Sequence, residues 1–247
     1  MLGVAHGETI FLYAAAGVKA PAQEIIAAFE QRTSHSVTRV YDTAGAAEER
    51  FVAAGKDGLL ITTEVRILKS SVGEPGMLRD GVSRRVGDTL AGVAISPSFA
   101  RSQPVLAMSS AIGTPHGLKS VLLAARRIAF SDPARGATVG THFTSIIDKL
   151  GIRQEVLAKA ITAKDGIETM RLVASDEVDL GITQVSEIVQ SNPKLLLGAF
   201  PKELELATRY NSWYASGASA AVKALADAFS NEAGNASLAR NGLRLPE

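Results

Sequence analysis

Cysteine is absent from the 247-residue sequence, which excludes disulfide bonds, thiolate catalysis and cysteine metal sites. No apolar run approaches the roughly 20 residues that cross a bilayer, so we expect a protein that is not embedded in a membrane. Basic residues are not in excess, because 26 Lys and Arg stand against 25 Asp and Glu and no basic run occurs. Nucleic acid is therefore not predicted as a partner.

Several motifs of enzymes and cofactor sites are missing as well. The sequence contains no P-loop, no GxGxxG after a strand and no GxSxG. No spacing of His, Asp and Glu resembles a metal site. We therefore expect neither a metal nor a cofactor.

The N-terminal stretch MLGVAHGETIFLYAAAG lacks the basic region of a signal peptide, and its apolar residues fit a first strand. The expected location is periplasmic, for a mature form from which the signal peptide is gone. A cytoplasmic location is the open alternative. The absence of cysteine suits an oxidising compartment.

The residues that are present suffice for well-packed cores, since 46% of them are hydrophobic, although only 5% are aromatic. The first part of the chain alternates short apolar strands with amphipathic helices. We predict strands over residues 9–16, 36–41 and 58–62, and helices over residues 20–32 and 46–54. This order predicts an α/β fold with a mostly parallel sheet covered by helices.

The middle of the chain repeats the alternation of strands and helices. A strand over residues 90–96 leads into the polar, proline-bearing segment 97–104, which we interpret as a crossing to a second lobe. An aromatic strand over residues 208–216 returns the chain, and a helix over residues 218–229 closes it. We therefore predict one lobe from residues 1–95 and 208–247, a second from residues 96–207, and a ligand cleft between them.

The stretch AFSDPARGATVGTHF, residues 129–143, passes from a strand end through a turn into a helix. Small residues and hydroxyls at a helix N-terminus favour anion binding, because the first amides lack intrahelical partners and the helix dipole is positive there. Arg135 adds a cation. An ordinary strand–turn–helix joint with capping hydroxyls explains the same stretch.

Four segments together resemble one family. They are LYAAAGVKAPAQEIIAAFEQRTSHSV, VYDTAGAAEERFVAAGKDGLLITTE, RRIAFSDPARGATVGTHFTSIIDKLGI and EVDLGITQVSEI. In this order and spacing they resemble the solute-binding proteins of ABC transporters with the two-lobed type II periplasmic-binding-protein fold, and specifically the molybdate-binding-protein group. The resemblance implies that each lobe is a mostly parallel sheet flanked by helices, with the ligand cleft between the lobes. It also implies a small anion as ligand, an ABC permease as partner, and a monomer.

The resemblance further implies that the ligand is held at strand-to-helix corners. From the first lobe these corners supply Ala16, Gly17, Val18, Thr43, Ala44 and Gly45. From the second lobe they supply Gly136, Ala137, Thr138, Thr141, Thr183 and Gln184.

The first-lobe corners depart from the molybdate pattern. That family has Ala-Ala-Ala-Ser and Ser-Ser-Gly, whereas this chain has Gly17 in the first loop and Thr43-Ala44 in the second. Losing a hydrogen bond to a charged ligand costs on the order of 1.5 to 3 kcal/mol. We therefore favour a larger organic anion, such as a carboxylate, over molybdate or tungstate.

Other side chains could complete the site. Lys19 either pairs with a ligand carboxylate or is a solvated lysine of the first helical turn. Arg135 either forms a bidentate bond to a carboxylate or belongs to a surface loop. Thr62 and Thr63 end the third strand and are expected near the cleft. The cluster of Tyr210, Trp213 and Tyr214 is interpreted as core or hinge packing rather than ligand stacking.

An enzyme on the same scaffold is the alternative function. The molybdate-binding-like group includes aconitate isomerase, which interconverts cis- and trans-aconitate by moving a proton along an allylic system. Such chemistry would need an anion clamp and one acid or base. His142 or Lys19 would be that group, although a lone histidine at a helix start is more often structural.

Overall fold

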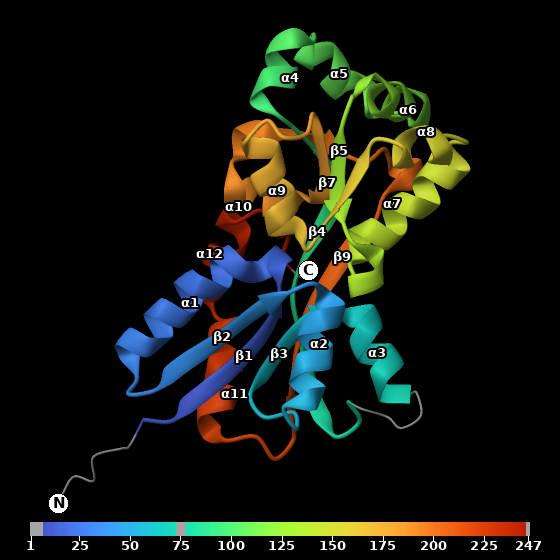
Figure 1. Ribbon diagram of the computed structural model, residues 1–247. Coiled ribbons are helices and arrows are strands. Elements are labelled where there is room, and N and C mark those ends of the chain that lie inside the picture. The colour runs from blue at the N-terminus through green and yellow to red at the C-terminus, as the bar shows by residue number, and fades with distance from the viewer. Residues whose placement is uncertain (1–6, 73–77, 246–247) are drawn as a thin grey trace, which may run out of the picture. The chain divides into compact units, whose positions relative to one another are not determined.

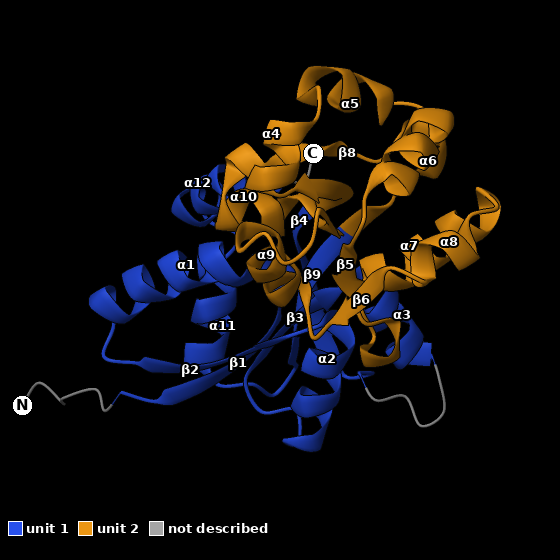
Figure 2. Cartoon of the chain, turned by 45° about the horizontal axis from the view of Figure 1, so that its top comes forward, with its two compact units in different colours: residues 1–88, 209–247 blue, residues 89–208 orange. Residues whose placement is uncertain are grey.

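The computed structural model describes residues 7–72 and 78–245 (Figure 1). Residues 1–6 and the loop signals Gly73, Pro75 and Gly76 lie outside the described residues. The chain divides into two compact units, coloured separately in Figure 2. Unit 1 comprises residues 1–88 and 209–247, and unit 2 comprises residues 89–208. The sequence analysis expected the lobes to meet between residues 95 and 96 and between residues 207 and 208. These limits stay a prediction, and they differ from the boundaries of the two units.

The sheet of unit 1 has the strand order β2-β1-β3-β9-β4. Strand β1 (Thr9–Ala15) pairs in parallel with β2 (Ser36–Asp42) and β3 (Leu59–Thr63). Strand β9 (Ala207–Ala215) runs antiparallel to β3 and neighbours β4 (Gly81–Ile95). The carboxyl ends of β1, β2 and β3 and the first residues of β9 therefore lie at the same edge of this sheet.

Helical segments follow the strands of unit 1. Their bounds are η1 (Ala16–Val18), α1 (Lys19–Arg32), α2 (Ala44–Ala53), α3 (Glu64–Val72), α11 (Ala220–Ala228) and α12 (Glu232–Arg240). In Figure 1, α1 and α11 and, separately, α2 flank the three parallel strands. This arrangement gives the unit a core on each face of its sheet.

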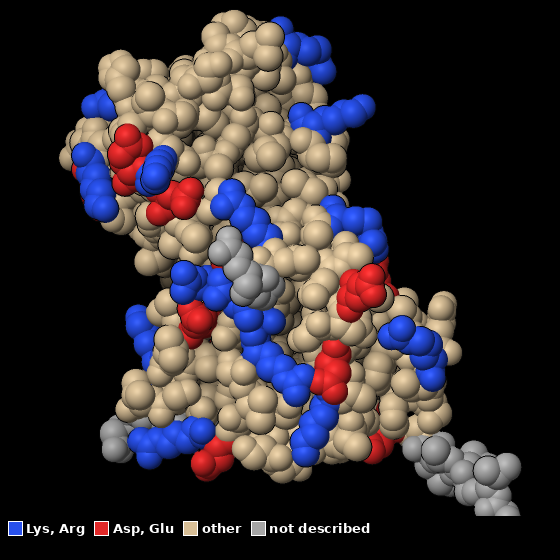
Figure 3. All heavy atoms as spheres, turned by 180° about the vertical axis from the view of Figure 1, so that it is seen from behind, with Lys and Arg blue, Asp and Glu red and all other residues tan. Residues whose placement is uncertain are grey.

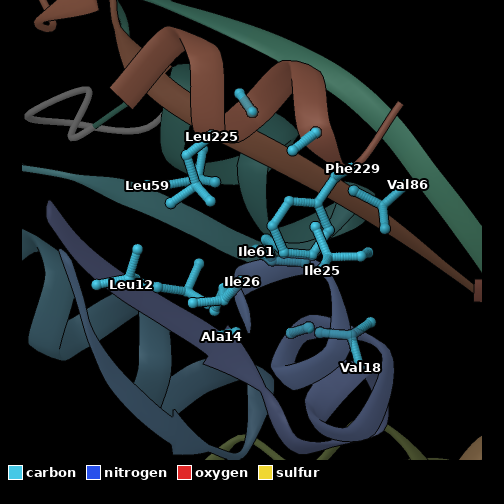
Figure 4. Close-up of a cluster of buried hydrophobic side chains, with 14 of the residues drawn as sticks. Leu12, Ala14, Val18, Ile25, Ile26, Leu59, Ile61, Val86, Leu225 and Phe229 are labelled. Carbon is cyan, nitrogen blue, oxygen red and sulfur yellow. The ribbon is translucent and has the colours of Figure 1, made fainter. Parts of the chain in front are cut away.

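Strand β1 contributes to both cores, because successive side chains of a strand point to opposite faces. Leu12 and Ala14 enter the larger cluster, in which Ile26 of α1 and Ile61 of β3 also lie (Figure 4). Tyr13 enters the smaller cluster. There the Phe51 ring meets the Tyr13 and Trp213 rings edge-on, with centroids 5.7 and 5.6 Å away.

The sheet of unit 2 combines antiparallel and parallel pairs. The later residues of β4 run antiparallel to β7 (Leu180–Gln184) and β8 (Leu196–Ala199). Strand β5 (Ile128–Ser131) pairs in parallel with β7 and with β6 (Ala160–Ala163). Strands β5 and β7 are entirely buried, as expected for parallel strands covered on both faces.

Short and long helices cover the sheet of unit 2. One buried contact between these helices and the sheet joins Phe143 of α7 to Phe130 of β5, whose ring centroids are 5.2 Å apart. The bounds are α4 (Pro97–Ser102), α5 (Val105–Ala111), α6 (Pro115–Ala124), η2 (Pro133–Arg135), α7 (Thr138–Lys149), α8 (Arg153–Leu157), α9 (Gly166–Ala174), α10 (Val185–Ser191), η3 (Pro193–Leu195) and η4 (Lys202–Leu204).

Residues 97–104, interpreted from the sequence as a crossing to a second lobe, form helix α4 over most of their length. Ser96 caps this helix, because its Oγ accepts a hydrogen bond from the Phe99 amide at 3.3 Å, and Pro97 occupies the first turn, where a proline is tolerated. The proline is thus a helix start and not a helix break.

Two features of the described residues bear on the partners expected above. No helix within residues 7–72 and 78–245 combines the length and apolarity that a bilayer crossing requires. The face in Figure 3 carries basic and acidic side chains separated by broad uncharged areas.

Candidate functional site

The first corner of unit 1 follows strand β1. Ala16, Gly17 and Val18 form the 3-10 turn η1 and are all buried, and Lys19 begins helix α1. No side-chain cap bonds the first turn of α1 within the described residues. The Lys19 amide donates to the Ala16 carbonyl oxygen, and Pro21 in the same turn has no amide hydrogen. The ammonium group of Lys19 lies 5.9 Å from the centroid of the Tyr41 ring, within the range of a cation–π interaction.

The second corner follows strand β2. Asp42 acts in the turn, because its Oδ1 accepts a hydrogen bond from the Thr43 amide at 2.8 Å and its Oδ2 lies 3.2 Å from Nη2 of Arg50. Thr43 is the cap of α2, and its Oγ1 accepts a hydrogen bond from the Ala46 amide at 3.2 Å. Ala44 and Gly45 then begin the helix and are buried.

Strand β3 ends beside these corners. The Thr62 hydroxyl donates to the Ala44 carbonyl oxygen at 2.9 Å, so it fastens the start of α2 to the sheet. Thr63 is 4% exposed and lies opposite Tyr210 of β9. Within unit 1, the structure therefore brings the expected residues of η1, α2 and β3 to one edge of one sheet.

The first corner of unit 2 joins β5 to α7. Gly136 adopts the left-handed conformation (φ 71°) and ends the turn, as glycine does at such positions. Nε of Arg135 donates to the Lys164 carbonyl oxygen at 3.1 Å, which ties this arginine to the turn before α9. Ala137 precedes α7 and, among the described residues, no side-chain cap bonds the first turn of the helix.

The hydroxyl groups of α7 differ in what they do. Thr141 donates to the Ala137 carbonyl oxygen at 3.0 Å, so its hydroxyl hydrogen is used within the helix. Thr138 is the first residue of the helix and is half-buried. Gly140 brings the helix close to β5, since a Cβ at this position would lie 1.8 Å from the Ser131 carbonyl oxygen.

His142, the candidate acid or base, is half-buried and holds a structural contact. Its Nε2 lies 2.8 Å from the Leu204 carbonyl oxygen. A carbonyl only accepts, so Nε2 carries a proton and Nδ1 is the nitrogen left for other chemistry. The ring also lies 6.2 Å from the Phe200 ring, between centroids.

The second corner of unit 2 joins β7 to α10. Thr183 is fully buried, and its hydroxyl donates to Oε2 of Glu187. The Gln184 amide donates to the same oxygen at 3.2 Å, and its side-chain Nε2 donates to the Thr208 hydroxyl at 2.9 Å. Within the described residues, the buried Gln184 Oε1 and Ser186 Oγ have no hydrogen-bond partner.

Glu187 is an ionisable group at this corner that the sequence analysis missed. Burial raises the pKa of its carboxyl group to about 7, an effect to which the negative charge of Asp165 adds. The hydrogen bonds from Thr183 and from the Gln184 amide act in the opposite direction and lower the pKa. A capping-box spacing, Gln184-x-x-Glu187, was the available signal. Tyr210, interpreted from the sequence as core or hinge packing, lies in the larger core cluster of unit 1.

Metal ligation finds no support in the side chains. Among residues 7–72 and 78–245, no group of three or more His, Asp or Glu residues is placed to hold a metal ion. What the corners offer is backbone amides, threonine hydroxyls and two cations, Lys19 and Arg135. Such groups can bind an anion through hydrogen bonds.

The two α/β units, one of which is assembled from both ends of the chain, define the two-lobed type II periplasmic-binding-protein fold. The chain belongs to the bacterial extracellular solute-binding protein family, whose sequence model matches residues 10–244. The fold and the family resemblance predicted from the sequence are thereby confirmed. No curated protein matches the sequence.

Solved structures share the fold at low sequence identity. The periplasmic molybdate-binding protein of Azotobacter vinelandii is 16% identical with a TM-score of 0.75, over 96% of this chain and 100% of that one. PEB3 of Campylobacter jejuni, in its L-phospholactate complex, is 15% identical with a TM-score of 0.67, over 96% and 100%. The periplasmic binding protein AfuA of Actinobacillus pleuropneumoniae, with fructose-6-phosphate bound, is 16% identical with a TM-score of 0.64, over 96% and 85%.

Proposed function

We propose that the protein is the periplasmic solute-binding component of an ABC transporter and that it captures a small organic anion of the polycarboxylate class. In this proposal, the corners of both units act on one ligand and hand it to a permease. The family membership supports the carrier role. The names of the three structural relatives support the anion, since molybdate, L-phospholactate and fructose-6-phosphate are all anions.

The observation that carries the anion proposal is the state of the start of helix α7. This helix of 12 residues has no side-chain cap in the described residues. Uncapped first-turn amides point their N–H groups outward and lie at the positive end of the helix dipole. An anionic ligand would satisfy them without needing a full counter-charge.

The preference for a carboxylate rests on the composition of the corners. Gly17 offers no hydroxyl, the hydroxyl of Thr141 is used within its own helix, and that of Thr183 is used by Glu187. A compact tetrahedral dianion needs many short donors, whereas an extended carboxylate can reach Lys19 and Arg135. Phospholactate, the ligand in the PEB3 structure, itself carries a carboxylate. We advance no isomerase, because His142 already bonds Leu204 through Nε2 and no observation favours a reaction.

The test is a thermal-shift panel of molybdate, sulfate, phosphate, citrate and cis- and trans-aconitate, since a bound ligand raises the melting temperature by mass action. We expect the carboxylates to give the largest shifts. Arg135→Ala should reduce the shift, whereas Arg153→Ala, which removes an exposed arginine that pairs with Asp148, should not. A largest shift with molybdate would refute the carboxylate class. A proton NMR time course in which trans-aconitate becomes the cis isomer would refute the pure carrier.

A further inference from the structure

Glu187 places a carboxyl group inside the β7–α10 corner of unit 2. Its Oε2 atom accepts hydrogen bonds from the Thr183 hydroxyl and, at 3.2 Å, from the Gln184 backbone amide. Both of these partners belong to the corner that is expected to hold the anion. Thr183 is fully buried and Glu187 is 8% exposed. The carboxyl group is therefore enclosed together with the corner and forms part of it.

The packing around the corner keeps this carboxyl group in place. The Gln184 side chain donates to the Thr208 hydroxyl at 2.9 Å, and the Ser186 amide donates to the Thr89 hydroxyl at 3.0 Å. Thr89 in β4 and Thr208 in β9 are the first and last residues of unit 2. The corner is thus bonded to both strands where the chain enters and leaves the unit. A charge on Glu187 therefore stays at the corner.

The charge that acts on Glu187 is negative. Helices α9 and η3 and strands β7 and β8 pack against α10. Asp165, the cap of α9, is 7% exposed, and its negative charge opposes ionisation of Glu187. On the same helix Glu168 pairs with Arg171 at 2.9 Å, and Lys194 of η3 is exposed. Strands β7 and β8 carry no charged side chain.

The Glu187 carboxyl group exists in two forms near neutral pH, because burial raises its pKa to about 7. The two forms act differently on an anion at the corner. The ionised form repels the anion, in a buried place where electrostatic interactions are stronger than in water, whereas the protonated form does not. An anion at the corner must in turn favour the protonated form, since the coupling between two binding events is reciprocal.

We infer that Glu187 links anion capture to the uptake of a proton. The corner binds its anion most tightly when the Glu187 carboxyl group is protonated, and the carboxyl group binds a proton when the anion arrives. The inference rests on the proposed anion-binding function and describes a regulation of the same site. Glu187 acts through Thr183 and Gln184 and through its charge, so it is a positioning residue that needs no contact with the anion. A rise in pH through neutrality therefore weakens anion binding.

The test measures proton uptake by calorimetry of anion binding at pH 7, in buffers that differ in ionisation enthalpy. The probe is the tightest-binding of citrate, trans-aconitate, phosphate and molybdate. The wild type is compared with Glu187→Gln, whose amide oxygen accepts the same two hydrogen bonds without titrating. The difference between the two proteins removes the titration of the anion itself. We expect the wild type to take up roughly 0.3 to 0.5 of a proton more per bound anion.

The pH profile of the dissociation constant is the second readout. Between pH 6 and pH 8 this constant should rise roughly three- to tenfold more in the wild type than in Glu187→Gln. Asp165→Asn keeps Glu187 and a capping side chain on α9, but it removes the negative charge that raises the pKa of Glu187. The loss of affinity should then occur at lower pH. Glu168→Gln, a change on the same helix, is the matched control and should keep the wild-type profile.

Equal proton uptake in the wild type and in Glu187→Gln overturns the inference, and so does an identical pH profile in the two proteins. If Glu187→Gln does not fold, Asp165→Asn decides alone, and a profile that is not shifted from that of Glu168→Gln overturns the inference. Anion binding without proton uptake leaves the proposed function intact. If the wild-type protein binds none of the four anions, the proposed function itself fails and the inference falls with it.

Discussion

Glu187 lies directly against Gly166. A Cβ on residue 166 would stand 1.9 Å from Oε2 of Glu187 and 2.4 Å from Oε1. Both residues are buried, and they bring the start of α9 against α10. The carboxyl group thus occupies a space that exists only because residue 166 lacks a side chain.

The first prediction concerns pH. The folded-state pKa of Glu187 is raised to about 7 by burial, whereas its unfolded value is ordinary. The folded protein therefore holds this proton more tightly, so the stability contributed by Glu187 is fully present below the unfolded pKa and is lost as pH rises through about 7. We expect the free energy of unfolding to fall by about 1 to 3 kcal/mol between pH 5 and pH 8.

Glu187→Gln should remove this dependence, because a neutral amide can accept the hydrogen bonds from Thr183 and the Gln184 amide without titrating. The measurement is urea unfolding of both proteins at several pH values. Equal slopes of stability against pH in the wild type and the variant would contradict the prediction.

The second prediction concerns Gly140. Its substitution by alanine would place a methyl group 1.8 Å from the Ser131 carbonyl oxygen, a backbone atom that cannot turn aside. We expect Gly140→Ala to destabilise the protein by about 1 to 3 kcal/mol, as overpacking does. Gly217→Ala is the control, since a Cβ there meets nothing within 4 Å. The free energy of unfolding of both variants is measured by chemical denaturation. Equal values for the two variants would disprove the expectation.

The third prediction separates capping from ligand binding at Thr43. Thr43→Ala removes the acceptor of the Ala46 amide and should cost about 0.5 to 2 kcal/mol of stability. Thr43→Ser keeps the hydroxyl and should restore most of this loss. If Thr43 also contacts the ligand, the alanine variant shows a smaller ligand-induced rise in melting temperature than the serine variant, and matching rises would confine Thr43 to capping.

The fourth prediction concerns the smaller core of unit 1. Phe51 is fully buried, and its ring meets the edges of Tyr13 and Trp213. Phe51→Ala should cost about 3 to 5 kcal/mol through lost burial and the cavity left behind. Trp213 is the single tryptophan, so its fluorescence spectrum should shift to longer wavelength as water approaches. The control is Phe11→Ala, at a side chain that is 38% exposed, and a small, equal effect in both variants would refute the prediction.

Elements with a strong local signal could be predicted from the sequence. Strand β3 is an apolar run after Gly58, and α11 repeats its apolar residues every three to four positions. Helix α3 was missed, because its charged sequence EVRILKSSV follows β3 without an intervening turn. Helices α4 and α5 were missed as well. They are short, and a proline begins the first and precedes the second.

The candidate site, too, could be predicted from the sequence only in part. The corners after β1, β2, β5 and β7 could be located because small residues and threonines mark them locally. The packing of Tyr210 against Gly17 could not, since Tyr210 reaches this corner only through the register of β9 on β3. The raised pKa of Glu187 could not be predicted from the sequence for a related reason. It depends on burial against Gly166, and burial is set by how the chain packs.

Unit 1 is assembled from two separate parts of the chain, and this has a consequence during protein synthesis. The ribosome releases residues 1–88 long before residues 209–247, yet β9 lies between β3 and β4 in this unit. Unit 2 is continuous, so its residues are all available while the outer edge of β3 still lacks a neighbour. An unpaired strand edge invites association with other chains. The nascent protein is therefore most exposed to aggregation, and most in need of a chaperone, in the interval before its last forty or so residues emerge.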